Sequence, residues 1–413
     1  MFRHVLCVLL AFFMVSSAWA GVDTSTVARS PDPGGSHLRI SLLTCGVGEE
    51  IYETFGHTAV RIIDSSKSGP LRDIVYNYGT FDGFDANFEI KFMRGKLLYY
   101  VNIDLYDAFM QEYLAAHRSV QEQVLLLNNE QKEKISSFLA QNALPANRYY
   151  KYDFFFDNCA TRIRDIFPKA LGPGFVFGQT FPPSSRITFR DIINKYFYRD
   201  HWERVGVNIL LGSRIDRVMT NSDIMFLPDY LRDGLAGATL NGQKVSTAPE
   251  LVLPGSNSAE AGTNWPLMAL VAAVLLLVIG LSVRALRWLG YVMMPLFLVL
   301  TGLLGCLILV MWFWTDHQGC GNNFNILWAF PGHLAVLFLS RKARGQYAVV
   351  AIGMLFLSLL LHVVRLQAII VEFLPIQLAL LCVFAYMYRM RNVSASHNTT
   401  QPYEAAANDD ALS

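Results

Sequence analysis

Cysteine is scarce in this sequence of 413 residues, which contains only 6. Cys7 falls in the apolar N-terminal leader, and Cys306 and Cys382 fall in long apolar runs, so no disulfide framework can be built. The sequence also lacks an H-E-x-x-H pattern and the closely spaced cysteines of zinc sites. We therefore expect no metal site and no cofactor.

Charged residues are sparse as well. Asp, Glu, Lys and Arg make up 16% of the chain, the formal net charge is +1, and no stretch forms a basic stripe. A surface that binds nucleic acid needs such a stripe to neutralise phosphates, so the sequence predicts no nucleic-acid partner.

Apolar residues are abundant, at 53% of the chain, and they are unevenly distributed. Arg3 and His4 precede an apolar run that ends in Ala18-Trp19-Ala20, which is typical of a cleavable signal peptide; an uncleaved anchor is the alternative. The predicted organisation is a signal peptide at 1–20, an exported globular domain at 21–250, a linker at 251–264, a membrane domain at 265–390 and a disordered cytoplasmic tail at 391–413.

Five apolar segments are candidate transmembrane helices, at about 265–283, 290–314, 325–340, 347–364 and 368–388. A helix needs about 20 apolar residues to cross the hydrocarbon core, whereas the third segment is short, contains Pro331 and His333, and could be re-entrant. Basic residues follow the first, third and fifth segments. This alternation predicts five spans, with the globular domain exported and the C-terminus cytoplasmic.

The globular part is predicted to be an α+β domain, a small antiparallel sheet with helices packed on it. Alternating apolar residues predict strands at 37–46, 57–64, 73–79, 97–103 and 119–128. Helical patterns cover 49–56, 105–117, 129–143 and 159–171, the second of them capped by Asp104 and the last broken by Pro168.

Cys159 stands at the start of the last of these helices. Asp157 or Asn158 is a suitable N-cap, and the unpaired N–H groups of a helix N-terminus stabilise a thiolate. Arg162, one turn later, could add positive potential or hold a phosphate. A buried packing residue and a Cys45–Cys159 disulfide are the alternatives.

A nucleophilic cysteine needs a histidine. The globular part offers His37, His57, His117 and His201. His57 is the best placed, because it begins a strand directly after the helix-ending Gly56. Asn77, on the neighbouring strand, could orient the imidazole, with Asp82 as the second choice.

Several segments resemble the Lnb-type lipoprotein N-acyltransferases. They are LLTCGVGEEIYETFGHTAVRI, VYNYGTFD, YDFFFDNCATRIRD, MFLPDYL and, in the membrane part, TDHQGCGNNFNILWAFPGHL. The order of histidine strand, orienting strand and cysteine helix also resembles the circularly permuted papain-like enzymes, such as lecithin:retinol acyltransferase. The resemblance covers most of the mature chain. Cys320 and Gly321 depart from the small polar residues expected in their loop.

The resemblance implies a multi-pass protein of the bacterial inner membrane whose catalytic domain lies in the periplasm. It makes Cys159 the nucleophile, His57 the general base and Asn77 the orienting residue. The implied reaction moves an acyl chain from a membrane phospholipid, through a cysteine thioester, to the α-amine of diacylated lipoproteins. The expected partners are thus phospholipid, lipoprotein and the bilayer. Candidate substrate or oxyanion residues are Asn158, Tyr78, Arg162, Asp316, His317 and Asn323.

Two other classes of function stay open. One is a thiol-dependent hydrolase on the same scaffold, either a phospholipase or a cell-wall peptidase, although a peptidase needs no more than a tether. The other is a non-enzymatic membrane binding or assembly factor, which would survive loss of Cys159 and His57. Polar residues at lipid depth, His333 and Glu372 among them, either line a lipid site or form interhelical hydrogen bonds.

Overall fold

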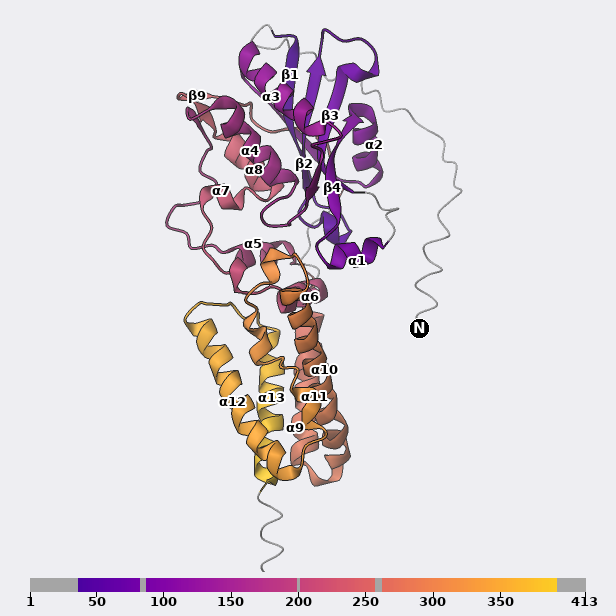
Figure 1. The fold of residues 1–413 in the computed structure, drawn as a ribbon, viewed down its shortest axis with the longest axis vertical. Coiled ribbons are helices and arrows are strands. Elements are labelled where there is room, and N and C mark those ends of the chain that lie inside the picture. The colour runs from indigo at the N-terminus through magenta and orange to yellow at the C-terminus, as the bar shows by residue number, and fades with distance from the viewer. Residues whose placement is uncertain (1–35, 82–86, 199–200, 257–261, 392–413) are drawn as a thin grey trace, which may run out of the picture.

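The computed structural model describes residues 36–81, 87–198, 201–256 and 262–391. The predicted signal peptide, the tail from residue 392 and Asp82 lie outside these ranges. Figure 1 shows an α/β domain stacked on a bundle of long helices.

The α/β domain is built on a seven-stranded sheet in the order β10-β5-β1-β2-β3-β4-β6, and all neighbouring strands are antiparallel. The strands are β1 (Leu38–Cys45), β2 (His57–Asp64), β3 (Asp73–Phe81), β4 (Leu98–Leu105), β5 (Val120–Val124), β6 (Tyr149–Lys151) and β10 (Glu250–Leu253). Side chains alternate between faces along β1, where Ile40 and Leu42 join one buried cluster and Leu43 and Cys45 another. Both faces of the sheet are therefore covered.

Helices pack on both faces of the seven-stranded sheet. α3 (Asn129–Ala143), α4 (Cys159–Leu171) and α8 (Pro228–Ala236) pack on one face, with the larger core between. α2 (Tyr106–Ala115) packs on the other face through Phe109 and Tyr113. Figure 1 shows α2 on one side of the strands and α4 and α8 on the other.

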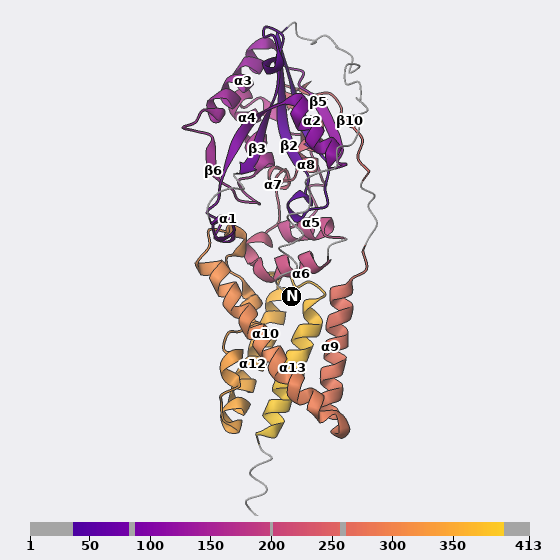
Figure 2. The ribbon, with the colours of Figure 1, turned by 90° about the vertical axis from the view of Figure 1, so that its right-hand side faces the viewer.

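Short elements complete the domain, and α5 and α6 lie between the large sheet and the bundle (Figure 2). They are η3 (Ile51–Glu53), η4 (Pro70–Arg72), α1 (Phe88–Met93), β7 (Phe175–Val176), α5 (Phe189–Tyr196), α6 (His201–Leu210), η5 (Ser213–Ile215), α7 (Asn221–Ile224), β8 (Thr239–Leu240) and β9 (Gln243–Lys244).

The predicted antiparallel sheet with packed helices is confirmed, but two local predictions are wrong. Pro168 does not break α4, which continues to Leu171, because the proline lies in the last turn and costs little helix beyond it. Asp104 does not cap α2. Leu105 is the N-cap residue, and the Asp104 carboxylate accepts hydrogen bonds from asparagine side chains instead.

Four helices of the described chain are long and apolar enough to cross a membrane: α9 (Trp265–Ser282), α10 (Arg287–Phe313), α12 (Arg341–Val363) and α13 (Phe373–Met390). The third predicted span, segment 325–340, is not a continuous helix. That segment forms the 3-10 turn η8 (Phe324–Leu327) and the four-residue helix α11 (His333–Val336). Pro331, which lacks an N–H group, stops a continuous helix there. An unbroken helix of this length would reach only about 24 Å, short of the hydrocarbon thickness.

The irregular segment keeps its backbone paired inside the bundle. His333 Nε2 contacts the Trp328 carbonyl at 3.0 Å, and the Arg344 guanidinium donates to the Val336 and Leu337 carbonyls. Non-helical backbone is tolerated at membrane depth when protein groups satisfy it in this way.

Buried polar contacts join the domain to the bundle. Asn323 Nδ2 donates to the carbonyls of Ile209 and Leu210 at 2.8 and 3.0 Å. Arg204 of α6 pairs with Glu372, the residue before α13, which also accepts from Asn264 at 2.9 Å. Of the two roles predicted for Glu372, a lipid site or hydrogen bonds between helices, these contacts favour the second.

Candidate active site

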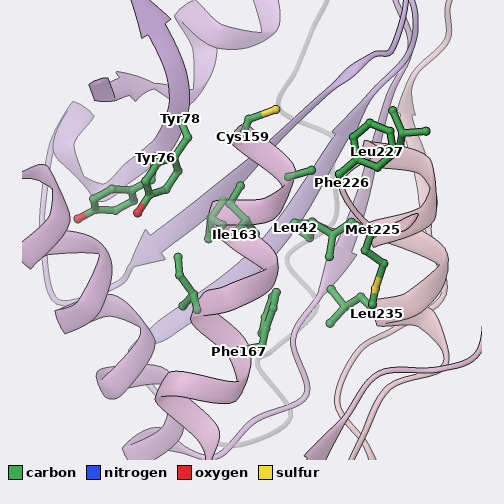
Figure 3. Close-up of a cluster of buried hydrophobic side chains, with 14 of the residues drawn as sticks. Leu42, Tyr76, Tyr78, Cys159, Ile163, Phe167, Met225, Phe226, Leu227 and Leu235 are labelled. Atoms are coloured by element: carbon green, nitrogen blue, oxygen red, sulfur yellow. The ribbon is translucent and has the colours of Figure 1, made fainter. Parts of the chain in front are cut away.

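Cys159 is the first residue of α4, as predicted. Asn158 caps the helix: its Oδ1 accepts from the Thr161 N–H at 2.9 Å, while Thr161 Oγ1 accepts from the Asn158 N–H at 2.8 Å. The Asn158 amide also donates to the Phe154 and Phe226 carbonyls, so this side chain fixes the helix start. Figure 3 shows the Cys159 side chain at that end of the helix.

His57 opens β2 and meets Cys159 and Asn77. Its Nε2 lies 2.7 Å from Asn77 Oδ1, and its ring also forms a side-chain hydrogen bond with Cys159. Asn77 lies on β3, which pairs antiparallel with β2. The three residues predicted for the site are therefore together, although 102 positions separate His57 from Cys159 along the chain.

Asp104 extends this chain of contacts, a role that its sequence context did not predict. Its Oδ2 accepts from Asn77 Nδ2 at 3.0 Å, and its Oδ1 accepts from Asn102 Nδ2 at 2.6 Å. The carboxylate thus holds the Asn77 amide with its oxygen toward His57. Its place directly before the helical pattern at 105–117 suggested a cap, whereas the pairing of Asn77 with Asn102 across β3 and β4 brings it to the site.

Electrostatics favour a charged pair. Burial raises the pKa of the Cys159 thiol, but the imidazole of His57 and the N–H groups of Thr58 and Ala160 outweigh it, and the pKa lies below its ordinary value. Burial lowers the pKa of His57, while Cys159 and Asn77 raise it, so that it ends above its ordinary value. Both shifts stabilise thiolate with imidazolium, the reactive form of a cysteine nucleophile.

Gly79 leaves space beside the pair. It has φ +93 at a bulge of β3, and a β-carbon placed there would lie 3.8 Å from Cys159 Cβ and 3.9 Å from His57 Cε1. A residue without a side chain both adopts this backbone conformation and keeps the approach to Cys159 clear.

Aromatic side chains form the wall of the site toward β4 and β6. Tyr78 is 2% exposed, and its ring lies 6.5 Å from that of Tyr150. Arg162 stacks over Tyr150 at 3.7 Å and forms a bidentate ion pair with Asp157 at 2.6 and 2.7 Å. Arg162 is therefore a cation already paired with Asp157 and stacked on Tyr150.

The candidate residues from the membrane part, Asp316, His317 and Asn323, lie in a loop that contacts the α/β domain. Asp316 pairs with Lys151 at 3.1 Å, and His317 Nε2 contacts the Phe92 and Met93 carbonyls, both at 3.1 Å. Asn323 is fully buried in its contacts with α6. The structure thus uses these three side chains to hold the two parts together rather than to surround Cys159.

The remaining histidines and cysteines have other surroundings. His37 lies 3.2 Å from Glu133, and His201 contacts the Gly262 carbonyl. Cys45 and Cys159 are both free, so the alternative of a disulfide between them is wrong for this structure. Burial raises the pKa of Cys45 to about 12, as it does for Cys320, which packs in the domain core.

A cavity of about 480 Å³ lies beside the turn that leads to His57. Its lining comes from that turn, from α5 and from α8, and consists of Val47, Gly48, Glu49, Thr54, Lys195, Tyr196, Tyr198 and Asp229. The Phe55 ring contacts both Tyr196, in this lining, and Phe154, five residues before Cys159.

The sequence predicts no metal site. In the described part of the chain, no group of three or more His, Cys, Asp and Glu residues is arranged so that it could hold a metal ion.

Fold and site together define a membrane-anchored α/β protein with a Cys–His–Asn arrangement at a helix N-terminus. Two family comparisons match the chain: residues 34–196 match the Lnb N-terminal periplasmic domain, and residues 261–394 match the Lnb transmembrane domain. The chain therefore belongs to the Lnb family, with a periplasmic N-terminal domain followed by membrane-spanning helices. The first match contains His57, Asn77 and Cys159. Searches with the chain found no matching curated protein and no matching solved structure.

Proposed function

We propose that this protein is a lipoprotein N-acyltransferase, which moves an acyl chain from a membrane phospholipid to the α-amine of the lipidated N-terminal cysteine of exported lipoproteins. The observation that carries the proposal is the contact chain Cys159–His57–Asn77 inside an Lnb periplasmic domain mounted on a membrane bundle.

In the first half-reaction, the Cys159 thiolate attacks the ester carbonyl carbon of the phospholipid. The resulting tetrahedral oxyanion collapses, the ester C–O bond breaks, and imidazolium His57 gives its proton to the departing alkoxide. The products are a thioester on Cys159 and a lysophospholipid. This covalent step divides a difficult transfer into two easier ones.

In the second half-reaction, the lipoprotein amine attacks the thioester carbonyl. His57 accepts a proton from the amine as the new amide bond forms, and the Cys159 thiolate leaves. The site returns to its initial charged pair, and the kinetics are of the ping-pong kind.

First-turn N–H groups of α4 are suited to stabilise the oxyanion. The Asn158 cap takes up the N–H of Thr161, which leaves those of Cys159 and Ala160 nearest the sulfur, and Ala160 N–H already points to it. One such donor is worth about 3 kcal/mol of transition-state stabilisation in other acyl-transfer enzymes. Both lipid substrates are held in the same membrane, which adds the advantage of proximity.

The chain order supports a permuted papain-like domain. His57 and Asn77 lie on adjacent strands that precede the cysteine helix, and Nε2 of the histidine contacts the asparagine as in a papain-like triad.

We place the C-terminus in the cytoplasm. Arg284 lies between α9 and α10, Arg287 begins α10, Arg341 begins α12 and Arg389 lies in the last turn of α13. These helix ends are at the end of the bundle remote from the periplasmic domain.

The proposal is tested in a Gram-negative strain depleted of its own N-acyltransferase that expresses wild type or Cys159→Ala. Mass spectrometry of lipoprotein N-terminal peptides should find an N-linked acyl chain with the wild type alone. Unmodified amines in both strains, with the protein folded and inserted, would contradict the proposal and favour a phospholipase, in which water attacks the thioester. N-acylated peptides in both would remove Cys159 as the nucleophile.

A further inference from the structure

The connection between β3 and β4 presents an apolar surface that is also basic. Ile90, Phe92 and Met93 of α1 are 50%, 53% and 58% exposed, and Leu98, at the start of β4, is 51% exposed. Arg94 and Lys96 are exposed among them. We call this surface the α1 patch and define it by Ile90, Phe92, Met93, Arg94, Lys96 and Leu98.

The α1 patch is fastened to the end of a membrane helix. The Asp316 N–H donates to the Arg94 carbonyl at 2.9 Å, and His317 contacts the Phe92 and Met93 carbonyls. Asp316 and His317 lie three and four positions beyond Phe313, the last residue of α10. Figures 1 and 2 agree in placing α1 beside the domain-side end of α10, at the lower edge of the periplasmic domain.

The neighbouring aromatic residues give the height of the patch relative to the bilayer. Phe313 and Trp314, at the end of α10, are 65% and 71% exposed. Exposed tryptophan at the end of a spanning helix is typical of the headgroup region. The α1 patch, hydrogen-bonded to Asp316 and His317, two and three residues beyond Trp314, therefore lies at the membrane interface rather than in open water.

The composition of the patch fits a lipid surface. Exposed apolar side chains clustered together are unusual on a domain that faces only water. Alternation of apolar side chains with cations is typical of segments that enter the interface, where apolar groups reach the acyl region and cations meet anionic headgroups.

Aromatic contacts lead from the patch toward the nucleophile. Leu98 is followed by Tyr99, whose ring stacks on Tyr152 at 4.4 Å and meets Phe81 at 5.3 Å. Tyr152 is near enough to Cys159 for the thiolate charge to raise its pKa, after the larger effect of burial.

We propose that the α1 patch inserts into the outer leaflet of the inner membrane and admits phospholipid from the bilayer toward Cys159. Insertion itself does not depend on the proposed acyl transfer, whereas the fate of the admitted lipid rests on that proposed function.

Photocrosslinking in the full-length protein tests the insertion. p-Benzoylphenylalanine replaces Met93 or, as a control, Leu71, an exposed residue (66%) of η4 at the opposite end of β3. The protein is reconstituted in vesicles of phosphatidylethanolamine and phosphatidylglycerol. Phospholipid adducts at position 93 and none at 71 are expected. Absent adducts at 93, or equal yields at both positions, would overturn the proposal.

The same experiment separates this inference from the acyl transfer. In a Cys159→Ala background the adducts at position 93 should persist. Adducts without any acyl-Cys159 in the wild-type site would leave insertion standing and defeat the proposed function. Acyl-Cys159 without lipid adducts at position 93 would support the proposed function and overturn the insertion.

A second variant tests admission of the lipid. Phe92→Asp with Met93→Asp should lower the rate of Cys159 acylation from vesicle phospholipid relative to its rate with a soluble nitrophenyl ester. Leu71→Asp should leave this ratio unchanged. Equal losses on both substrates, or an unchanged ratio in the double variant, would overturn the proposal.

Discussion

Asn77 Oδ1 lies 2.7 Å from Nε2 of His57, and this contact determines the working face of the imidazole. With Nε2 engaged, Nδ1 is the ring nitrogen left for Cys159. Asn77 is itself held by Asp104, so a carboxylate orients an amide that orients the histidine. Asn77 and Asp104 act through His57 and are positioning residues.

Replacement of Asp104 by Asn should lower the rate of acyl transfer by about 10- to 100-fold, because groups that orient a catalytic side chain commonly have effects of this size. An amide at position 104 offers one acceptor oxygen where the carboxylate offers two, so Asn77 and Asn102 compete for it and the orientation of the Asn77 amide is no longer fixed. Initial rates with a soluble ester, measured across pH, check this. Asn102→Ala is the matched control, since Asn102 also donates to Asp104 but its contact does not involve Asn77 or His57. Equal effects of both variants would contradict a specific role for the Asn77 contact.

The pH dependence of alkylation reports the charged pair. Iodoacetamide reacts with thiolate, and because the pKa of Cys159 is lowered, its alkylation should persist below pH 9.0, the ordinary pKa of a cysteine, and fail only as pH falls through the lowered value. In His57→Ala, burial would dominate and the midpoint should rise. Peptide mass spectrometry follows Cys159 separately from Cys45 and Cys320. A midpoint that does not move would show that His57 leaves the thiol unaffected.

Enzymatic activity should fall on both sides of a plateau. On the acid side the Cys159 thiolate is protonated, and on the alkaline side His57 loses its proton. Since one pKa is lowered and the other raised, the plateau is wider than that of an unpaired cysteine and histidine, and its two limits belong to the pair. A single ionisation in the profile of acyl transfer would contradict the charged pair.

Gly79→Ala should reduce enzymatic activity much more than Gly69→Ala does, although the two variants should lose similar unfolding free energy. Gly69→Ala is the matched control, because Gly69 also has positive φ, +73, but nothing lies within 4 Å of its added β-carbon. Both should lose about 1 kcal/mol of unfolding free energy through backbone strain. Only Gly79→Ala fills the space beside Cys159 and His57. Equal activities of the two variants would show that this space is not used.

Arg204→Ala should destabilise the joined domains. It leaves Glu372, which is fully buried, without its cation, and breaking such a pair costs about 3 kcal/mol or more. Thermal unfolding in detergent should show a lower Tm, and Glu372→Gln added to Arg204→Ala should recover part of it. No recovery would assign the loss to packing by Arg204 rather than to the unpaired carboxylate.

The features of this site that depend on neighbouring residues along the chain could be predicted from the sequence. Strand alternation placed His57 at a strand start and Asn77 on its neighbour, and helix-cap chemistry placed Cys159 at a helix start. Local patterns also account for the misassigned residues. Asp104 has the same sequence context as a helix cap, and only the register of β4 against β3 brings it to Asn77.

Tertiary contacts explain the other differences. Asp316, His317 and Asn323 are polar residues near the membrane, which is typical of a substrate site, yet their partners are backbone carbonyls and a lysine of the periplasmic domain. Segment 325–340 is apolar enough for a span. Its irregular backbone is stable because His333 and Arg344 supply donors that no local pattern reveals.

The proposed transfer requires that Cys159 carries the acyl chain as a thioester. The most direct test is peptide mass spectrometry of full-length protein purified in nanodiscs with phosphatidylethanolamine and without an acceptor. We expect one acyl group on the peptide containing Cys159, removed by neutral hydroxylamine as a thioester is, and absent from Cys159→Ala and His57→Ala. An unmodified Cys159 in protein that is folded and embedded with its lipid, or an acyl group on another residue, would contradict it.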